Sequence, residues 1–88
     1  MKTFLNPWHA PRNSYSPERY LASDHPILYR GAEIHGQPSS VIVVVNDAVV
    51  TERVTVSNAK DYIDRYADGT MPNYELQWMR KCQEKAKQ

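Results

Sequence analysis

The residues that most often bind metals or carry catalysis are few and widely spaced in this chain. The histidines are His9, His25 and His35, and the single cysteine is Cys82. No two of them have the short spacing of a metal motif such as C-x-x-C or H-x-x-x-H. We therefore expect no metal site, and we expect the histidines to be structural or to lie at the surface.

Nucleophilic catalysis would require Cys82 to meet His35 across the fold. Cys82 falls on the apolar stripe of a predicted helix, where a free cysteine usually packs as a small hydrophobic residue. The serines lack the pattern of a nucleophile elbow. An acid–base pair is conceivable among the carboxylates, but the ten acidic residues of this chain would bring some pairs together by chance: Glu33, Asp47, Glu52 and Asp61.

Phosphate binding has no support either, because the three glycines form no glycine-rich loop. The sequence therefore predicts a protein that is not an enzyme and that needs no cofactor.

Tryptophan, tyrosine and methionine are the more informative residues, because these three types often anchor protein interfaces. The alternative for each of these side chains is that it completes the core of its own domain, and we expect Trp8 and Trp78 to be the exceptions. The candidates for protein binding are Trp8, Tyr15, Tyr20, Trp78 and Met79.

DNA binding is the second function that the sequence leaves open. A three-stranded sheet backed by a helix resembles the arm-binding domain of phage-type integrases, which lays its sheet in the major groove. That use needs basic and hydrogen-bonding side chains on the exposed face, whereas the predicted sheet is rich in valine. The basic residues that could contact nucleic acid are Arg12, Arg19, Arg30, Arg53, Lys81 and Lys85.

Composition favours one small globular domain in a reducing compartment. With 88 residues the core is thin, and a net charge of +1 argues against a protein that coats nucleic acid by charge alone. One cysteine excludes an intramolecular disulfide. Asn6-Pro7 interrupts the start of the chain before any signal peptide could form, and no apolar run reaches the roughly 20 residues of a membrane span. We expect a cytoplasmic protein that does not enter membranes.

The clearest structural signal is a β-hairpin that begins at Val41. Asn46 and Asp47 tolerate the left-handed backbone of a tight turn, and runs of β-branched residues flank them. In residues 41–45 both faces of the strand are apolar, which is typical of a central strand covered on both sides. A helix can cover one of these apolar faces. The other face must be covered by the N-terminal arm, by the last helix or by a second molecule, and the last case would give a homodimer.

The remaining elements complete an α+β fold: a three-stranded antiparallel sheet packed by one or two C-terminal helices. Residues 1–26 form an aromatic, proline-rich arm, with one helical turn from Ser16-Pro17 to about Ala22, and residues 27–88 form a βββαα domain. Residues 27–35 are the first strand, with a bulge or close approach at Gly31. One helix is capped by Asn58 and ends at Gly69, and a second runs from Pro72 to about Lys85. The apolar stripe of the second helix comprises Met71, Tyr74, Trp78, Met79 and Cys82.

Short patterns spread over the chain to about residue 66 resemble small accessory proteins of bacterial prophages and mobile elements. They are Asn6-Pro7, residues 14–20 (SYSPERY), Tyr29-Arg30-Gly31 with Ile34, and Asn58-Ala59-Lys60 with Ile63-Asp64. The resemblance implies a bacterial host cell and an accessory role, with inhibitors of host defence of the anti-CRISPR type among the possibilities. The valine-rich hairpin and the helix of Trp78 are not part of the pattern.

From the residues and the resemblance together we expect a non-enzymatic accessory protein that binds and inhibits a host protein, with a CRISPR-type defence complex as one such target. A small DNA-binding accessory factor is the alternative.

Overall fold

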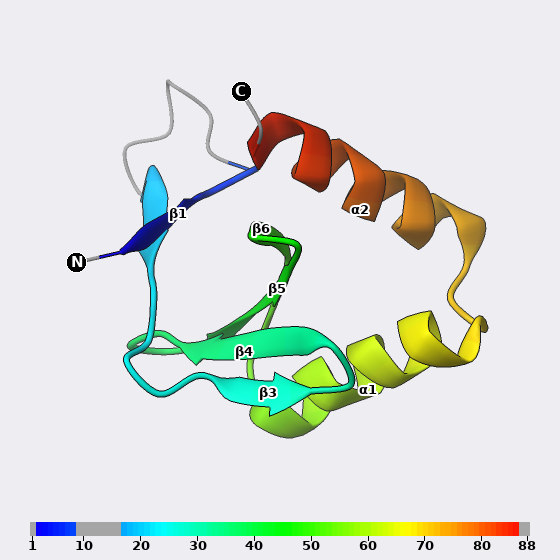
Figure 1. Ribbon diagram of the computed structural model, residues 1–88, viewed down its shortest axis with the longest axis horizontal. Coiled ribbons are helices and arrows are strands. Elements are labelled where there is room, and N and C mark those ends of the chain that lie inside the picture. Colours follow the sequence, from blue (N-terminus) through cyan, green and yellow to red (C-terminus); the bar gives the residue numbers. More distant parts are fainter. Residues whose placement is uncertain (1, 9–16, 87–88) are drawn as a thin grey trace.

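The computed structural model describes residues 2–8 and 17–86, and it confirms the α+β class (Figure 1). The main sheet is antiparallel, with strands in the order β3 (Ile27–Tyr29), β4 (Ala32–Gly36), β5 (Val41–Val45) and β6 (Ala48–Arg53). Two short strands, β1 (Thr3–Leu5) and β2 (Arg19–Leu21), form a separate antiparallel pair. Helices α1 (Val56–Asp68) and α2 (Asn73–Ala86) follow the sheet.

The predicted hairpin is confirmed as β5 and β6. Asn46 and Asp47 have φ angles of 53° and 64°, the pattern of a type I′ turn, whose twist matches that of the flanking strands. The pairing shifts within β6, because Val49 pairs with Val44 while Thr51 pairs with Val43. Val50 is therefore the extra residue of a β-bulge.

The single strand predicted for residues 27–35 is wrong, because this stretch is itself a hairpin. Arg30 and Gly31 have φ angles of 49° and 86°, so both adopt the left-handed conformation that a tight turn requires. Ile27 consequently pairs with Ile34 across the turn. Gly31 marks a turn and not a bulge, and the sheet has four strands in place of three.

Both faces of β5 are buried, as its sequence predicts. Val41, Val43 and Val45 pack with side chains of α1 and α2 in one core cluster. The opposite face forms a second cluster, in which Ile42 and Val44 contact residues of the N-terminal segment. That segment and the helices thus lie on different sides of the main sheet (Figure 1). No second molecule is needed to cover these side chains.

The N-terminal arm is a pair of strands that packs on the sheet. Phe4 lies opposite Tyr20 in the β1–β2 register, and both side chains are buried in the second cluster. The helical turn predicted from Ser16-Pro17 to Ala22 is wrong where the chain is described, because residues 19–21 are strand β2. Placing Tyr20 beside Phe4 in this cluster buries an aromatic ring, which stabilises the extended conformation over a solvated helical turn.

His35 joins the arm to the sheet. Its ring is buried, contacts the edge of Phe4 with centroids 5.0 Å apart, and accepts the Ser23 backbone N–H at Nδ1 over 2.9 Å. Its Nε2 lies 3.0 Å from a carboxylate oxygen of Glu33. His35 therefore has a structural role.

The helices begin and end close to the predicted positions, with one correction. The cap of α1 is Thr55, whose hydroxyl accepts the Asn58 N–H over 3.2 Å, so Asn58 is inside the helix. Gly69 ends α1 with φ of 76°, as predicted. On α2 the inward-facing Met79 and Cys82 are buried, whereas Tyr74 is 72% exposed and does not belong to the buried stripe.

Candidate functional site: a cleft beside two stacked tryptophans

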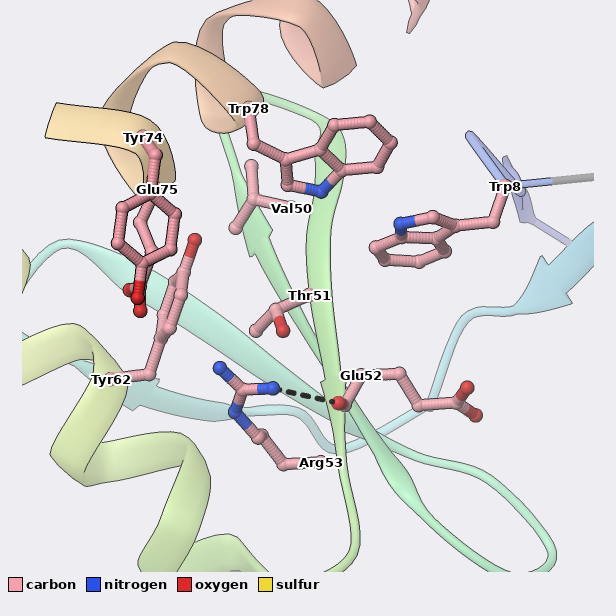
Figure 2. Close-up of a pocket in the computed structure, with 9 residues that line it drawn as sticks. All are labelled: Trp8, Val50, Thr51, Glu52, Arg53, Tyr62, Tyr74, Glu75 and Trp78. Atoms are coloured by element: carbon pink, nitrogen blue, oxygen red, sulfur yellow. Dashed lines mark hydrogen bonds between the residues drawn. The ribbon is translucent and has the colours of Figure 1, made fainter. Parts of the chain in front are cut away.

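A cleft of about 430 Å³ opens where α2, β6 and α1 meet the N-terminal segment (Figure 2). Its volume lies within the usual range for ligand sites, roughly 300–1,000 Å³. Four of its lining residues are aromatic and three are charged: Trp8, Tyr62, Tyr74 and Trp78, with Glu52, Arg53 and Glu75; Val50 and Thr51 complete it.

Trp8 and Trp78 face each other at one end of the cleft. Their rings stack with centroids 5.9 Å apart and planes 26° from parallel. Trp8 is still 37% exposed, so the stack leaves apolar ring surface open to solvent. These are the two residues that the sequence selects as exceptions to core packing, and the fold brings them together from opposite ends of the chain.

Hydrogen bonds to the backbone hold Trp8 in this position. Its N–H donates to the Asn6 side chain over 2.8 Å, and the Asn6 amide donates to the Pro17 carbonyl over 2.8 Å. Lys85 of α2 donates to the Pro7 carbonyl over 3.0 Å. The Trp8 end of the cleft is therefore fixed both to Pro17, which precedes β2, and to the end of α2.

The bulge at Val50 forms the floor. Side chains alternate between faces in a regular strand, but here Val50 and the next residue, Thr51, both line the cleft. The extra residue thus lets β6 send Val49 to the arm face and then two consecutive side chains to the helix face.

Tyr62 of α1 forms the inner wall and holds two guanidinium groups against its ring. The guanidinium carbon of Arg53 lies 5.1 Å from the ring centroid and that of Arg65 lies 5.8 Å away. Burial, and next the nearby charge of Glu75, raise the pKa of Tyr62 to about 12. Its hydroxyl makes no hydrogen bond within the described part of the chain.

The carboxylates of the cleft are already paired. Glu75 accepts from Nη1 of Arg65 over 3.1 Å and 3.2 Å. Glu52 accepts from the Tyr20 hydroxyl over 3.2 Å and from the Ser40 hydroxyl over 2.5 Å. Arg65 therefore neutralises the charge of Glu75, whereas the two hydroxyl donors solvate the charge of Glu52 without neutralising it.

Arg53, by contrast, has no ion pair within residues 2–8 and 17–86. Within the same residues, its side chain makes one hydrogen bond, from Nη1 to the backbone carbonyl of Glu52 at 3.5 Å, the upper limit for such a contact (Figure 2). The cleft thus contains one cation that no carboxylate of the described residues pairs with.

The raised pKa values of two buried tyrosines, Tyr20 and Tyr62, predict that the fold loses stability at high pH. The pKa of Tyr20 is raised to about 12, by burial and then by the charge and hydrogen bond of Glu52, and that of Tyr62 also to about 12. An unfolded tyrosine ionises near pH 10. The neutral phenols therefore stabilise the fold fully below about pH 10, and this contribution is lost as the pH rises toward 12.

Urea unfolding followed by circular dichroism across this pH range measures the effect, and absorbance of the phenolate follows ionisation. Tyr62→Phe is the matched variant, because it removes one of the two groups and should reduce the slope of stability against pH. A free energy of unfolding that stays constant from about pH 9 to about pH 12 would contradict the prediction.

The other predicted interface residues lie elsewhere. Tyr20 and Met79 are buried on opposite sides of the main sheet and belong to the core. Tyr15 lies outside the described residues. Of the predicted aromatic set, the cleft therefore contains Trp8 and Trp78.

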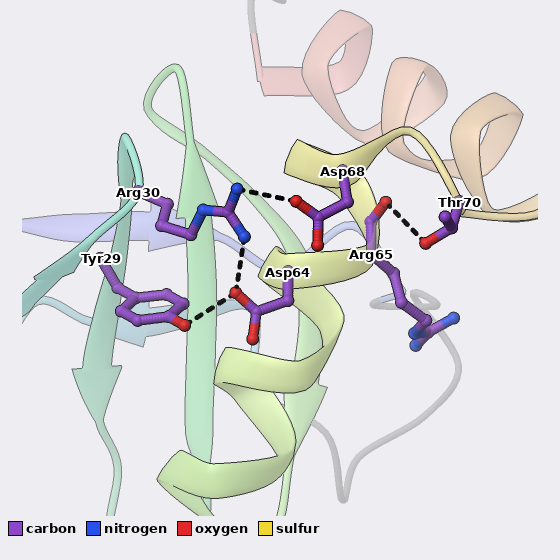
Figure 3. A network of polar contacts seen from close by, with 6 residues as sticks. All are labelled: Tyr29, Arg30, Asp64, Arg65, Asp68 and Thr70. Carbon is purple, nitrogen blue, oxygen red and sulfur yellow. Dashed lines mark hydrogen bonds and ion pairs between the residues drawn. The ribbon is translucent and has the colours of Figure 1, made fainter.

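The residues predicted for nucleic acid do not form one surface element. Arg12 is outside the described residues, Arg19 is on β2, and Lys81 and Lys85 are on α2. Arg30 is neutralised by Asp64 and Asp68 of α1, over 2.9 Å and 2.8 Å (Figure 3).

The same network lowers the pKa of Asp64, through the hydrogen bond from the Tyr29 hydroxyl first and the one from Arg30 next. Moreover, β5 is buried on both faces. The centre of the sheet is therefore not available to enter a DNA groove.

Cys82 and His35 do not meet, because Cys82 packs in the helix-side cluster and His35 contacts Phe4 on the arm side. Burial raises the pKa of the Cys82 thiol to about 11, so it is a poor nucleophile. Among residues 2–8 and 17–86 no group of three or more His, Cys, Asp or Glu side chains could hold a metal ion.

Comparison with known proteins gives no family. No protein-family model, curated protein or solved structure matches this chain. In the part of the chain that the structure describes, no helix has the length and apolar character needed to cross a membrane.

Sequence reasoning missed three features of the cleft. In the sequence, Tyr62 is one more apolar position on a predicted helix, and Glu75 is an acidic residue in the first turn of the next helix. For Arg53 the sequence predicts a role only as a possible contact to nucleic acid. No local pattern could have placed these three together, since their contacts depend on how α1 packs on β6 and how α2 returns over it.

Proposed function

We propose that this chain is a non-enzymatic binding module that holds a segment of a partner protein in the cleft beside the stacked Trp8 and Trp78. The observation that carries the proposal is the pair itself: two stacked tryptophans, partly exposed, at the end of a preformed cleft. Tryptophans anchored by a well-packed surrounding contribute disproportionately to protein binding.

The construction of the cleft supports binding over catalysis. Its carboxylates are paired with donors, and the cysteine is buried away from it. The rigid supports of Trp8, by contrast, reduce the entropy that a partner must overcome on docking. Inhibition of a host protein by occlusion, as the resemblance to prophage accessory proteins implies, stays a prediction, and so does a defence complex as the target.

A selection from a displayed library of random peptides tests the proposal. We expect peptides that bind the whole chain and lose at least about tenfold in affinity when Trp8→Ala or Trp78→Ala is introduced. Leu28→Ala is the matched control, because Leu28 is a 75% exposed apolar residue on β3, outside the cleft.

Peptides that bind both tryptophan variants as tightly as the original chain would contradict the proposal, and so would a selection that enriches nothing. Retention on DNA that falls steeply with salt and is unchanged by both tryptophan variants would favour the DNA-binding alternative instead.

A further inference from the structure

The polar groups of the cleft indicate the charge of its occupant. Glu75 is paired with Arg65, whereas Glu52 accepts from two hydroxyl groups and has no ion pair among the described residues. Arg53 retains its charge without a carboxylate partner among the described residues. Among the charged lining residues, Arg53 is therefore the one without a side-chain partner in the described part of the chain, and a carboxylate of the occupant can pair with it.

The orientation of Arg53 also favours a carboxylate. Its guanidinium carbon lies 5.1 Å from the centroid of the Tyr62 ring, and its N–H donors bond to no side chain among the described residues. Those donors match the two oxygens of a carboxylate in a bidentate pair. This cation–π contact with a buried ring favours one position of the guanidinium before any partner arrives.

The walls of the cleft also require that the occupant carry an apolar group. Trp8 and Trp78 present ring surface at this cleft, whereas Val50 beneath it is fully buried (Figure 2). An aromatic side chain placed there can stack on or meet the edges of the indoles. The occupant must then carry its acidic group close to this apolar group.

We propose that the cleft binds a segment of a partner protein in which an aromatic residue is followed by acidic residues. The aromatic side chain packs against Trp8 and Trp78, and a carboxylate pairs with Arg53. This inference rests on the proposed function and narrows it to one class of partner sequence.

The chain offers a direct probe of this site, because its two tryptophans both line the cleft. In a nitrogen–proton NMR spectrum the two indole N–H signals report on the cleft alone. We would titrate the whole chain with a capped peptide Ser-Phe-Asp-Glu-Ser, with its counterpart Ser-Phe-Asn-Gln-Ser, and with Ser-Phe-Lys-Lys-Ser.

We expect the acidic peptide to shift both indole signals and to bind at least about tenfold more tightly than the amide peptide, as a charge-assisted bidentate pair implies. In Arg53→Gln this preference should vanish, and in Arg53→Lys part of it should remain. Unchanged dispersion of the other backbone signals shows that each variant is folded.

Equal or tighter binding of the lysine or amide peptide by the original chain would overturn the inference, as would a preference for the acidic peptide that survives in Arg53→Gln. If the selected peptides depend on both tryptophans but show no acidic preference, the inference fails and the proposed function stands. If no peptide moves the indole signals and the library enriches nothing, both fail.

Discussion

A chain shortened to residues 27–88 is expected to lose its cooperative fold. The sequence predicts this stretch as a domain with an arm attached, but the arm contributes Phe4 and Tyr20 to the second core cluster. Without the arm, the side chains of Ile42, Val44 and Val49 face water on that side of the sheet. Burying one such side chain contributes roughly 1.5–3 kcal/mol, against a total stability of about 5–15 kcal/mol for a small domain.

Thermal unfolding followed by circular dichroism, together with size-exclusion chromatography, measures this loss. The full chain with Phe4→Ala and Tyr20→Ala is the matched variant, since it removes the same two rings and keeps the backbone. We expect the short chain to show no cooperative transition or to aggregate through the exposed sheet. A transition within about 1 kcal/mol of the full chain would show that the arm is not part of the core.

This result bears on the question of a homodimer. The doubly apolar strand β5 allows three covers from sequence alone: the arm, the last helix or a second copy. In the structure the arm covers Ile42 and Val44, so that strand gives no further reason for self-association. A dimer formed only by the short chain would agree with this interpretation.

The features that sequence predicts well are those whose cause is local. Asn46-Asp47 forms the expected turn, and Gly69 ends α1 in the expected left-handed conformation. Both depend on the conformational preferences of one or two residues. Arg30-Gly31 is less typical of a tight turn than Asn46-Asp47. For this reason the sequence predicts a bulge at Gly31 within one strand, where the structure has a turn between two strands.

The features that sequence misses depend on contacts between distant segments. The pairing of β1 with β2 has no local signal, since each strand has three residues and the turn preferences of Pro17 favour another structure. No local signal marks the bulge at Val50, because its neighbours Val49 and Thr51 are also β-branched. The bulge nevertheless determines which side chains of β6 line the cleft. Trp8 and Trp78 could be selected by type, but only the fold shows that they stack.

Tyr62→Ala is expected to destabilise the chain by about 3–5 kcal/mol, the usual cost of removing a buried aromatic ring. Tyr62 is 3% exposed and packs in the helix-side cluster, so its loss leaves a cavity between α1 and the sheet. Urea unfolding measures the change. Tyr62→Phe is the matched control and should cost less than about 1 kcal/mol, because it keeps the ring and removes a hydroxyl that bonds to no other described residue.

The same substitution separates the two contributions of Tyr62 to the site. Its ring supports the guanidinium of Arg53, so Tyr62→Ala, studied below its own unfolding transition, should weaken the preference for acidic peptides even though Arg53 is still present. Tyr62→Phe should keep that preference, since an aromatic face suffices for the stacking. A stability loss below about 1 kcal/mol for Tyr62→Ala would contradict the packing described for α1. An undiminished acidic preference would show that Arg53 needs no aromatic support to bind a carboxylate.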